Sequence, residues 1–303
     1  AGDLFDAVNP PPQLLSGAIR AMKRKNLRVF VLAGNHDRAS NQPGDHALGP
    51  LSSVHKFDVI EVPEIIDVGT HTLAAIPFLP GHAPDYLEQV VDDLGAPKGS
   101  VLCLHLGVYD DNTPDYLRNS HDAVPASLVF KICRKHGFPA AVVGNWHERR
   151  AWKGKDGTII QQVGALSPTG WDNEGINPYG GVAFWDGDRI TMECAPGPRF
   201  LKVSGQKQLN ALATTLETAS GALNPDLPHV GCSFYVRAVA EKGEEEKLRS
   251  RIEELRSRVG ESVFPAFEIV GDSKKAQEAA KQAAVSAKTA GNDLADVVGG
   301  YVD

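Results

Sequence analysis

The sequence feature that most constrains the fold is a pattern that occurs three times. A short apolar run ends in glycine, asparagine or histidine: Val29 to Leu32 runs into AGNHD, Val101 to Leu104 into HLG, and Ala140 to Val143 into GNWH. Short apolar runs bounded by turn residues are typical of strands buried in a sheet. In α/β sheets, functional groups lie in the crevice beyond the carboxyl ends of such strands. The pattern predicts an α/β fold with its site at one sheet edge.

Helices are expected between these strands, and a second domain after them. Residues 13–25, 83–94 and 126–136 have helical apolar spacing, and short β runs follow from 159 to 203. The composition changes near Ser204. A strand at 233–239, a helix at 244–259 and a strand at 264–270 form a predicted β-α-β unit, and helices close the chain. The predicted domains are residues 1–203, 204–271 and 272–303.

Composition excludes several classes of protein. With 42% hydrophobic and 23% charged residues, the chain is neither a disordered tail, a collagen nor a coiled-coil rod. It has no apolar run of ~18 residues, so no transmembrane helix is expected. AGDLFD is no signal peptide and lacks an initiator Met, which suggests that the native start is missing. Four cysteines without CxxC spacing predict free thiols and a cytoplasmic location. The net charge of −7 argues mildly against nucleic acid, although carboxylates that hold metal would account for part of it.

Four short motifs carry oxygen or imidazole groups at the ends of predicted apolar strands. They are GDLFD at 2–6, GNHD at 34–37, His105 in LHLG, and GNWH at 144–147. Asp, Asn and His suit Mn, Fe, Zn or Mg, and a neighbouring glycine lets the backbone approach a metal or phosphate. Each motif alone is weak: a lone His is more often structural, and GNHD could be an ordinary turn. The four together, in this order, are a strong signal.

This order of motifs resembles the calcineurin-like metallophosphoesterase superfamily, and within it the SbcD/Mre-type DNA double-strand-break repair nuclease subunits of bacteria and phages. GALSPTG at 164–170, PRFLKV at 198–203, the β-α-β unit and the final LADVVGGYVD fit the same resemblance. It implies a four-layer α-β-β-α metallophosphoesterase sandwich with two mixed sheets, followed by a small α/β capping domain.

The resemblance also implies a role for each motif residue. Asp3 would bridge two divalent metal ions, with Mn favoured over Mg, Fe or Zn. Asn35 and His105 would bind the second metal and His147 the first. His36 would face the scissile phosphate, and Asp37 would orient the His36 ring. Asp6 would lie outside the ligand set.

Two departures from the family pattern stand out. The Asp-x-His motif that opens the family occurs nowhere in the 303 residues, and the family places it upstream of GDLFD. Asn145 stands where the family has a histidine ligand in GHxH. An amide oxygen can bind a metal, but it is a weaker ligand for transition metals than imidazole. Asn145 is retained as an expected ligand.

Cations close to the last motif are expected to contact substrate. Arg38, Arg149 and Arg150 are the candidates for binding the DNA backbone. The alternative is an ordinary solvated β-hairpin. Trp152 would then pack, rather than stack on a base.

The resemblance implies a 3′→5′ exonuclease and endonuclease with a two-metal mechanism that acts in DNA repair or recombination. It implies a homodimer and an SbcC-type coiled-coil ABC ATPase as partner. The docking helix would present Leu294, Val297, Val298 and Tyr301, unless this stripe packs on its own domain. The alternatives are a small-molecule phosphodiesterase or phosphatase of the same superfamily, and a non-catalytic DNA-binding scaffold.

Overall fold

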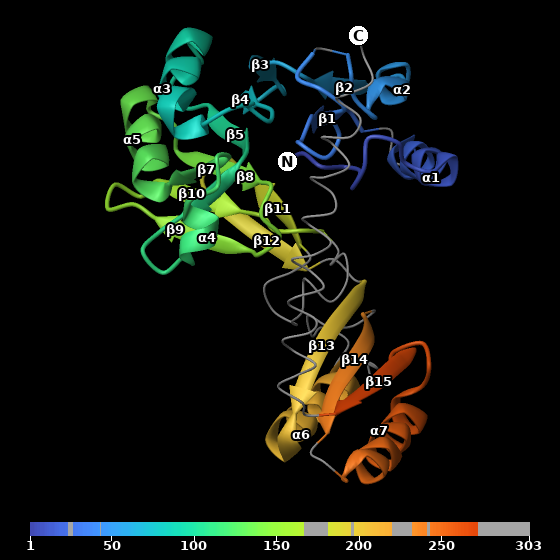
Figure 1. Cartoon of the computed structure of the whole chain (residues 1–303). Coiled ribbons are helices and arrows are strands. Elements are labelled where there is room, and N and C mark those ends of the chain that lie inside the picture. The colour runs from blue at the N-terminus through green and yellow to red at the C-terminus, as the bar shows by residue number, and fades with distance from the viewer. Residues whose placement is uncertain are drawn as a thin grey trace, which may run out of the picture. The chain divides into compact units, whose positions relative to one another are not determined.

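The computed structural model divides the chain at Gly197 into two compact units, Ala1–Gly197 and Pro198–Asp303 (Figure 1). The structure describes residues 1–23, 27–42, 44–166, 181–194, 197–219, 232–240 and 243–271. None of the helices within these ranges combines the length and the apolar character that a membrane span requires.

The first unit is built on a mixed sheet of six strands, in the order β3-β4-β5-β8-β10-β9. The four central strands are parallel to one another, and the edge strands β3 and β9 are antiparallel to their neighbours. The strands span Glu64–Asp67 (β3), Thr72–Ile76 (β4), Val101–His105 (β5), Ala140–Gly144 (β8), Arg150–Lys153 (β9) and Ile159–Gln162 (β10). Two of the three predicted strands are thus confirmed as neighbours, β5 and β8.

Helices α3 (Ala83–Leu94) and α5 (Ala126–His136) lie side by side and pack on this sheet (Figure 1). Their apolar stripes, which include Leu87 and Ile132, share one core with Leu102 and Leu104 of β5. Both helices end at a glycine in the left-handed region, where a residue without Cβ has no steric penalty. The predicted helices at 83–94 and 126–136 are confirmed.

A smaller parallel sheet pairs β1 (Val29–Leu32) with β2 (Phe57–Ile60), and α1 (Pro12–Lys23) and α2 (Gly49–Ser52) are its helices. One face shares a core with Ile19 of α1. The other face, through Leu32 and Ile60, contacts Ile66 and Ala75 of the larger sheet. Mixed α/β architecture with several sheets is confirmed. The full four-layer metallophosphoesterase sandwich stays a prediction, since the smaller sheet has two strands among the described residues.

Short elements complete the first unit. β6 (Gly107–Tyr109) and β7 (Ala123–Pro125) pair in parallel beyond the end of β5, and α4 (Asp115–Arg118) lies between them in the chain. β11 (Gly181–Trp185) and β12 (Ile190–Cys194) form an antiparallel pair.

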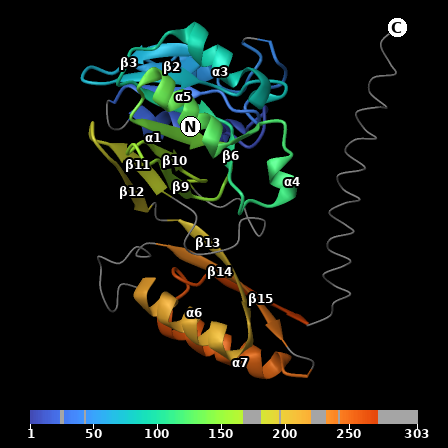
Figure 2. The ribbon, with the colours of Figure 1, turned by 90° about the vertical axis from the view of Figure 1, so that its left-hand side faces the viewer.

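The second unit is a three-stranded parallel sheet with two helices on one face (Figure 2). Its elements are β13 (Pro198–Ser204), α6 (Gly205–Ala219), β14 (Ser233–Ala240), α7 (Glu245–Val259) and β15 (Ala266–Gly271). The β-α-β prediction is confirmed. The domain boundary differs: residues 198–203, assigned from sequence to the first domain, pair with β14 and so belong to the second unit. The C-terminal stripe from Leu294 to Tyr301 lies outside the described residues.

Candidate functional site

Three side chains from separate motifs meet at the end of β5. His105 is the last residue of this strand, Asn35 follows β1, and Asp3 lies in the N-terminal loop. His105 Nε2 is 3.0 Å from Asn35 Oδ1 and 3.2 Å from Asp3 Oδ2. The backbone N–H of His36 donates to the other Asp3 oxygen at 3.0 Å. Sequence positions 3, 35 and 105 thus form one cluster, as the motifs predicted.

Glycines allow this close approach. A Cβ at Gly2 would lie 1.9 Å from His105 Nδ1, one at Gly34 would lie 2.0 Å from Asp3 Oδ1, and one at Gly144 would lie 1.9 Å from the Ala1 carbonyl oxygen. No side chain fits at these positions. The glycines of three of the four motifs thus allow close contact with another part of the chain, while the expected approach of the backbone to a metal or phosphate stays a prediction.

The backbone is strained at two of the predicted ligands. Asp3 has φ 52°, and Asn145 has φ 84°. Among the described non-glycine residues, only Lys56 shares this left-handed conformation. Such conformations cost free energy and occur preferentially at functional sites.

The donor atoms of the cluster fit a divalent cation. His105 Nδ1 is 2.6 Å from the Ala1 carbonyl, so an N–H there leaves the Nε2 lone pair for a metal. Asp3 and Asn35 add oxygens. Burial opposes ionisation of Asp3, but contacts with His105 and His36 outweigh it and hold the pKa of its carboxyl below the ordinary value. Within the described ranges, no group of three or more His, Cys, Asp or Glu side chains could hold a metal, so the fit rests on this Asp-His-Asn set.

The GNWH motif lies beside the cluster. Gly144 is the register partner of His105 across β8 and β5, and Asn145 follows it directly. The Asn145 Nδ2 amide donates to Asp122 Oδ2 at 2.7 Å. His147 is exposed, and its carbonyl accepts from the Ala165 N–H. The ligand roles of Asn145 and His147 stay predictions.

The structure gives Asp37 contacts other than those expected. Its carboxylate is fully buried and accepts the backbone N–H groups of Phe5 and Gly34 at 3.0 Å each, and of Leu4 at 3.4 Å. It thereby joins the GDLFD and GNHD loops. The exposed ring of His36 instead has Asp6, whose Oδ1 lies 3.8 Å from Nδ1. The His36 ring is thus paired with Asp6 and not with Asp37.

Two of the three predicted substrate-binding arginines are engaged within the protein. Arg38 Nη2 donates to the Glu61 carbonyl at 2.5 Å. Arg150 pairs with Glu148 Oε2 at 2.9 Å and donates to the Thr113 hydroxyl at 3.0 Å. Arg149 is half-buried. Because internal partners already hold Arg38 and Arg150, contacts from them to DNA would have to compete with these bonds.

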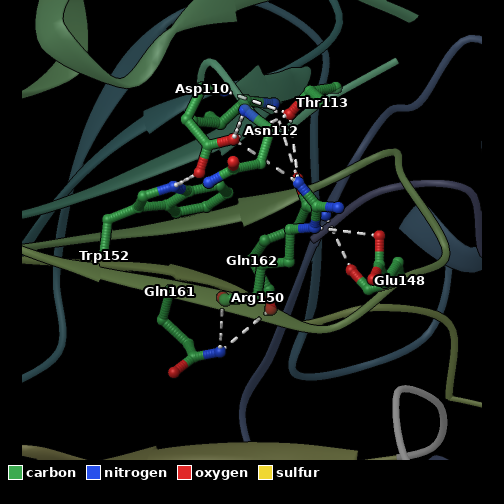
Figure 3. A network of polar contacts seen from close by, with 9 residues as sticks. Asp110, Asn112, Thr113, Glu148, Arg150, Trp152, Gln161 and Gln162 are labelled. Atoms are coloured by element: carbon green, nitrogen blue, oxygen red, sulfur yellow. Dashed lines mark hydrogen bonds and ion pairs between the residues drawn. The ribbon is translucent and has the colours of Figure 1, made fainter.

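Trp152 packs against other protein residues, which favours the alternative that this side chain packs and does not stack on a base. It is half-buried against the main core of the first unit, and its Nε1–H donates to Asp110 Oδ2 at 2.8 Å. Figure 3 shows Trp152 and Arg150 converging on the loop that carries Asp110 and Thr113. The hydrogen bond from Trp152, with further bonds from Asn112 and Thr113 and the nearby Arg150 charge, lowers the pKa of Asp110.

Replacing Asp110 with alanine is expected to lower the free energy of unfolding by about 1–2 kcal/mol, since Trp152 and Thr113 lose their acceptor. The folded state lowers the Asp110 pKa, so this stabilisation is present at neutral pH and is lost as the pH falls through the lowered pKa. Urea unfolding at pH 7 and near pH 3 measures both effects. The exposed neighbour Asp111→Ala is the control, and an equal loss in both variants would contradict the role of the network.

A comparison with known proteins found one distant similarity. The chain is 27% identical over 175 residues to the DNA double-strand break repair protein Mre11 of Sulfurisphaera tokodaii. The match covers 54% of this chain and 41% of that relative, so the chain spans less than half the relative's length. No family model matches the chain. This distant similarity supports the metallophosphoesterase nuclease family in general, and does not reach the SbcD type within it.

Proposed function

We propose that this chain is a metal-dependent DNA nuclease subunit of the metallophosphoesterase class. The observation that carries the proposal is the meeting of Asp3, Asn35 and His105 at the end of β5, with donor atoms 3.0 and 3.2 Å apart. The similarity to a protein named for DNA double-strand break repair supports DNA as the substrate.

Each residue then has a defined task. Asp3, Asn35, His105 and Asn145 would hold one divalent cation, and His147 would bind a second one. Bound divalent metals polarise phosphoryl oxygens and supply hydroxide at neutral pH. Mn is the favoured metal, with Mg, Fe and Zn as alternatives.

His36 is the proposed proton donor. Its backbone N–H is fixed by Asp3, while its ring is exposed and has Asp6 at 3.8 Å. The ring is therefore free to reach a phosphodiester beside the cluster and to protonate the leaving oxygen.

The proposal extends to partners. DNA is the substrate, an SbcC-type ATPase binds the C-terminal stripe of Leu294, Val297, Val298 and Tyr301, and the subunit forms a homodimer. Gel filtration tests for the homodimer. Co-purification with such an ATPase, with and without Leu294→Glu, tests the contact with the ATPase. An unchanged complex with the ATPase in the variant would contradict the proposal that this stripe binds it.

The function is tested with double-stranded DNA labelled at one end, in Mn²⁺ and in EDTA. Stepwise shortening in Mn²⁺ alone, lost in His36→Ala, is the expected result. Hydrolysis of bis(p-nitrophenyl) phosphate without DNA cleavage would favour the small-molecule enzyme. DNA binding without any cleavage would favour the scaffold.

A further inference from the structure

Asp122 is a carboxylate that no motif contains, and the fold places it beside the cluster. It directly precedes β7, and its backbone carbonyl accepts the Gly107 N–H at 2.9 Å. Gly107 begins β6, two residues beyond His105. The side chain is half-buried and binds on both oxygens: Oδ2 accepts from Asn145 Nδ2 at 2.7 Å, and Oδ1 accepts from the Ser120 hydroxyl.

This contact fixes the orientation of the Asn145 amide. An ionised carboxylate can only accept hydrogen bonds, so the amide atom facing Asp122 must be the NH₂ group. The Asn145 carbonyl oxygen, Oδ1, is consequently turned away from Asp122. That oxygen is the only atom of the side chain that can bind a cation.

The loop that carries Asn145 is also held in place. The residue adopts φ 84°, and its neighbour Trp146 lies so close to Gly107 that a Cβ there would be 2.2 Å from the indole ring. On the other side, the Ala1 carbonyl leaves no room for a Cβ at Gly144. A strained residue between two packed neighbours is typical of a preorganised ligand.

We propose that Asp122 is a positioning residue that presents the Asn145 amide oxygen to the cation site of Asp3, Asn35 and His105. The inference rests on the proposed function and deepens it. Asp122 acts on Asn145 as an outer carboxylate acts on a histidine ligand: it fixes the orientation and increases the electron density on the donor atom.

Calorimetric titration of the full chain with Mn²⁺ tests the proposal without any activity measurement. Asp122→Ala is expected to weaken Mn²⁺ binding 10- to 100-fold, as outer-carboxylate changes do. Asp122→Asn keeps an oxygen that can accept from Asn145, and is expected to restore most of the affinity. Ser120→Ala, which removes the other bond to Asp122, is the matched control and should stay within about threefold of wild type.

A double-mutant comparison gives a second readout. In Asn145→His, the imidazole Nδ1–H can donate to Asp122 and leave Nε2 for the metal, so Zn²⁺, which imidazole suits better than an amide oxygen, should bind more tightly. The gain should shrink when Asp122→Ala is added, because the imidazole then loses its partner. Equal gains in both backgrounds would show that Asp122 orients nothing.

The outcomes separate the two proposals. Unchanged Mn²⁺ affinity in Asp122→Ala, with a lower free energy of unfolding, would make Asp122 a structural residue and overturn this inference alone. Mn²⁺ binding that depends on Asp122 but supports no DNA cleavage would overturn the proposed function and leave the positioning role intact. A wild-type chain that binds no Mn²⁺ would overturn both.

Discussion

Replacing His105 with alanine is expected to lower metal-dependent DNA cleavage by about 10²–10³-fold, which is what removing one group that stabilises transition-state charge costs in rate. His105 Nε2 is the atom that Asp3 and Asn35 both approach, and its ring is almost completely buried. Without it, the remaining donors are a carboxylate and an amide. Cleavage of end-labelled DNA in Mn²⁺, followed over time, measures the loss.

Three controls accompany the His105→Ala measurement. His55→Ala removes an exposed histidine outside the cluster and should cleave at the wild-type rate. His105→Gln keeps a similar volume and a polar end, so it separates loss of the ligand from loss of packing. Circular dichroism and Mn²⁺ titration of both His105 variants establish whether they fold and bind metal. Wild-type cleavage by folded His105→Ala would remove His105 from the site.

Replacing Asp37 with alanine is expected to lower the free energy of unfolding by about 3–5 kcal/mol. Its carboxylate is the acceptor for the buried N–H groups of Phe5 and Gly34, and each such group left without an acceptor costs about 1–3 kcal/mol. The third and longer bond, from Leu4, adds to the loss. Urea unfolding monitored by circular dichroism measures the change.

Asp6→Ala is the matched control for Asp37. Its side chain is 85% exposed, and its contact to His36 spans 3.8 Å, so its loss should change stability by less than about 0.5 kcal/mol. Asp37→Asn keeps one acceptor oxygen and should fall between the two. Equal stability of Asp37→Ala and Asp6→Ala would show that Asp37 does not hold the two loops together.

The sequence predicted the strands and helices that follow local rules. Residues 101–104 and 140–143 lie in β5 and β8. Short apolar runs of this length that are bounded by turn residues are typical of buried strands. The helix at 205–219 was missed. Residues 198–203, assigned from sequence to the first domain, pair with β14 across 35 residues, a contact that no local pattern records.

The meeting of Asp3, Asn35 and His105 could also be predicted from local sequence patterns, whereas contacts that depend on the tertiary fold could not. Asp3, Asn35 and His105 each follow an apolar run or a glycine, and such positions gather at one sheet edge. Asp122 has no such signal, because its position beside Asn145 depends on the parallel pairing of β6 with β7. The internal partners of Arg150 depend on contacts with Thr113, 37 residues away in the chain, which spacing alone does not show.

The length of chain enclosed by the contacts of His105 has a kinetic consequence. The hydrogen bond to the Ala1 carbonyl spans 104 residues, and the contact with Asn35 spans 70. Contacts of such high sequence separation form late, since loop closure must be completed before they stabilise anything. A partly folded chain would therefore have no such cluster, and a cation bound at it would select the native state by mass action. Metal added during refolding should then leave the folding rate nearly unchanged and slow unfolding.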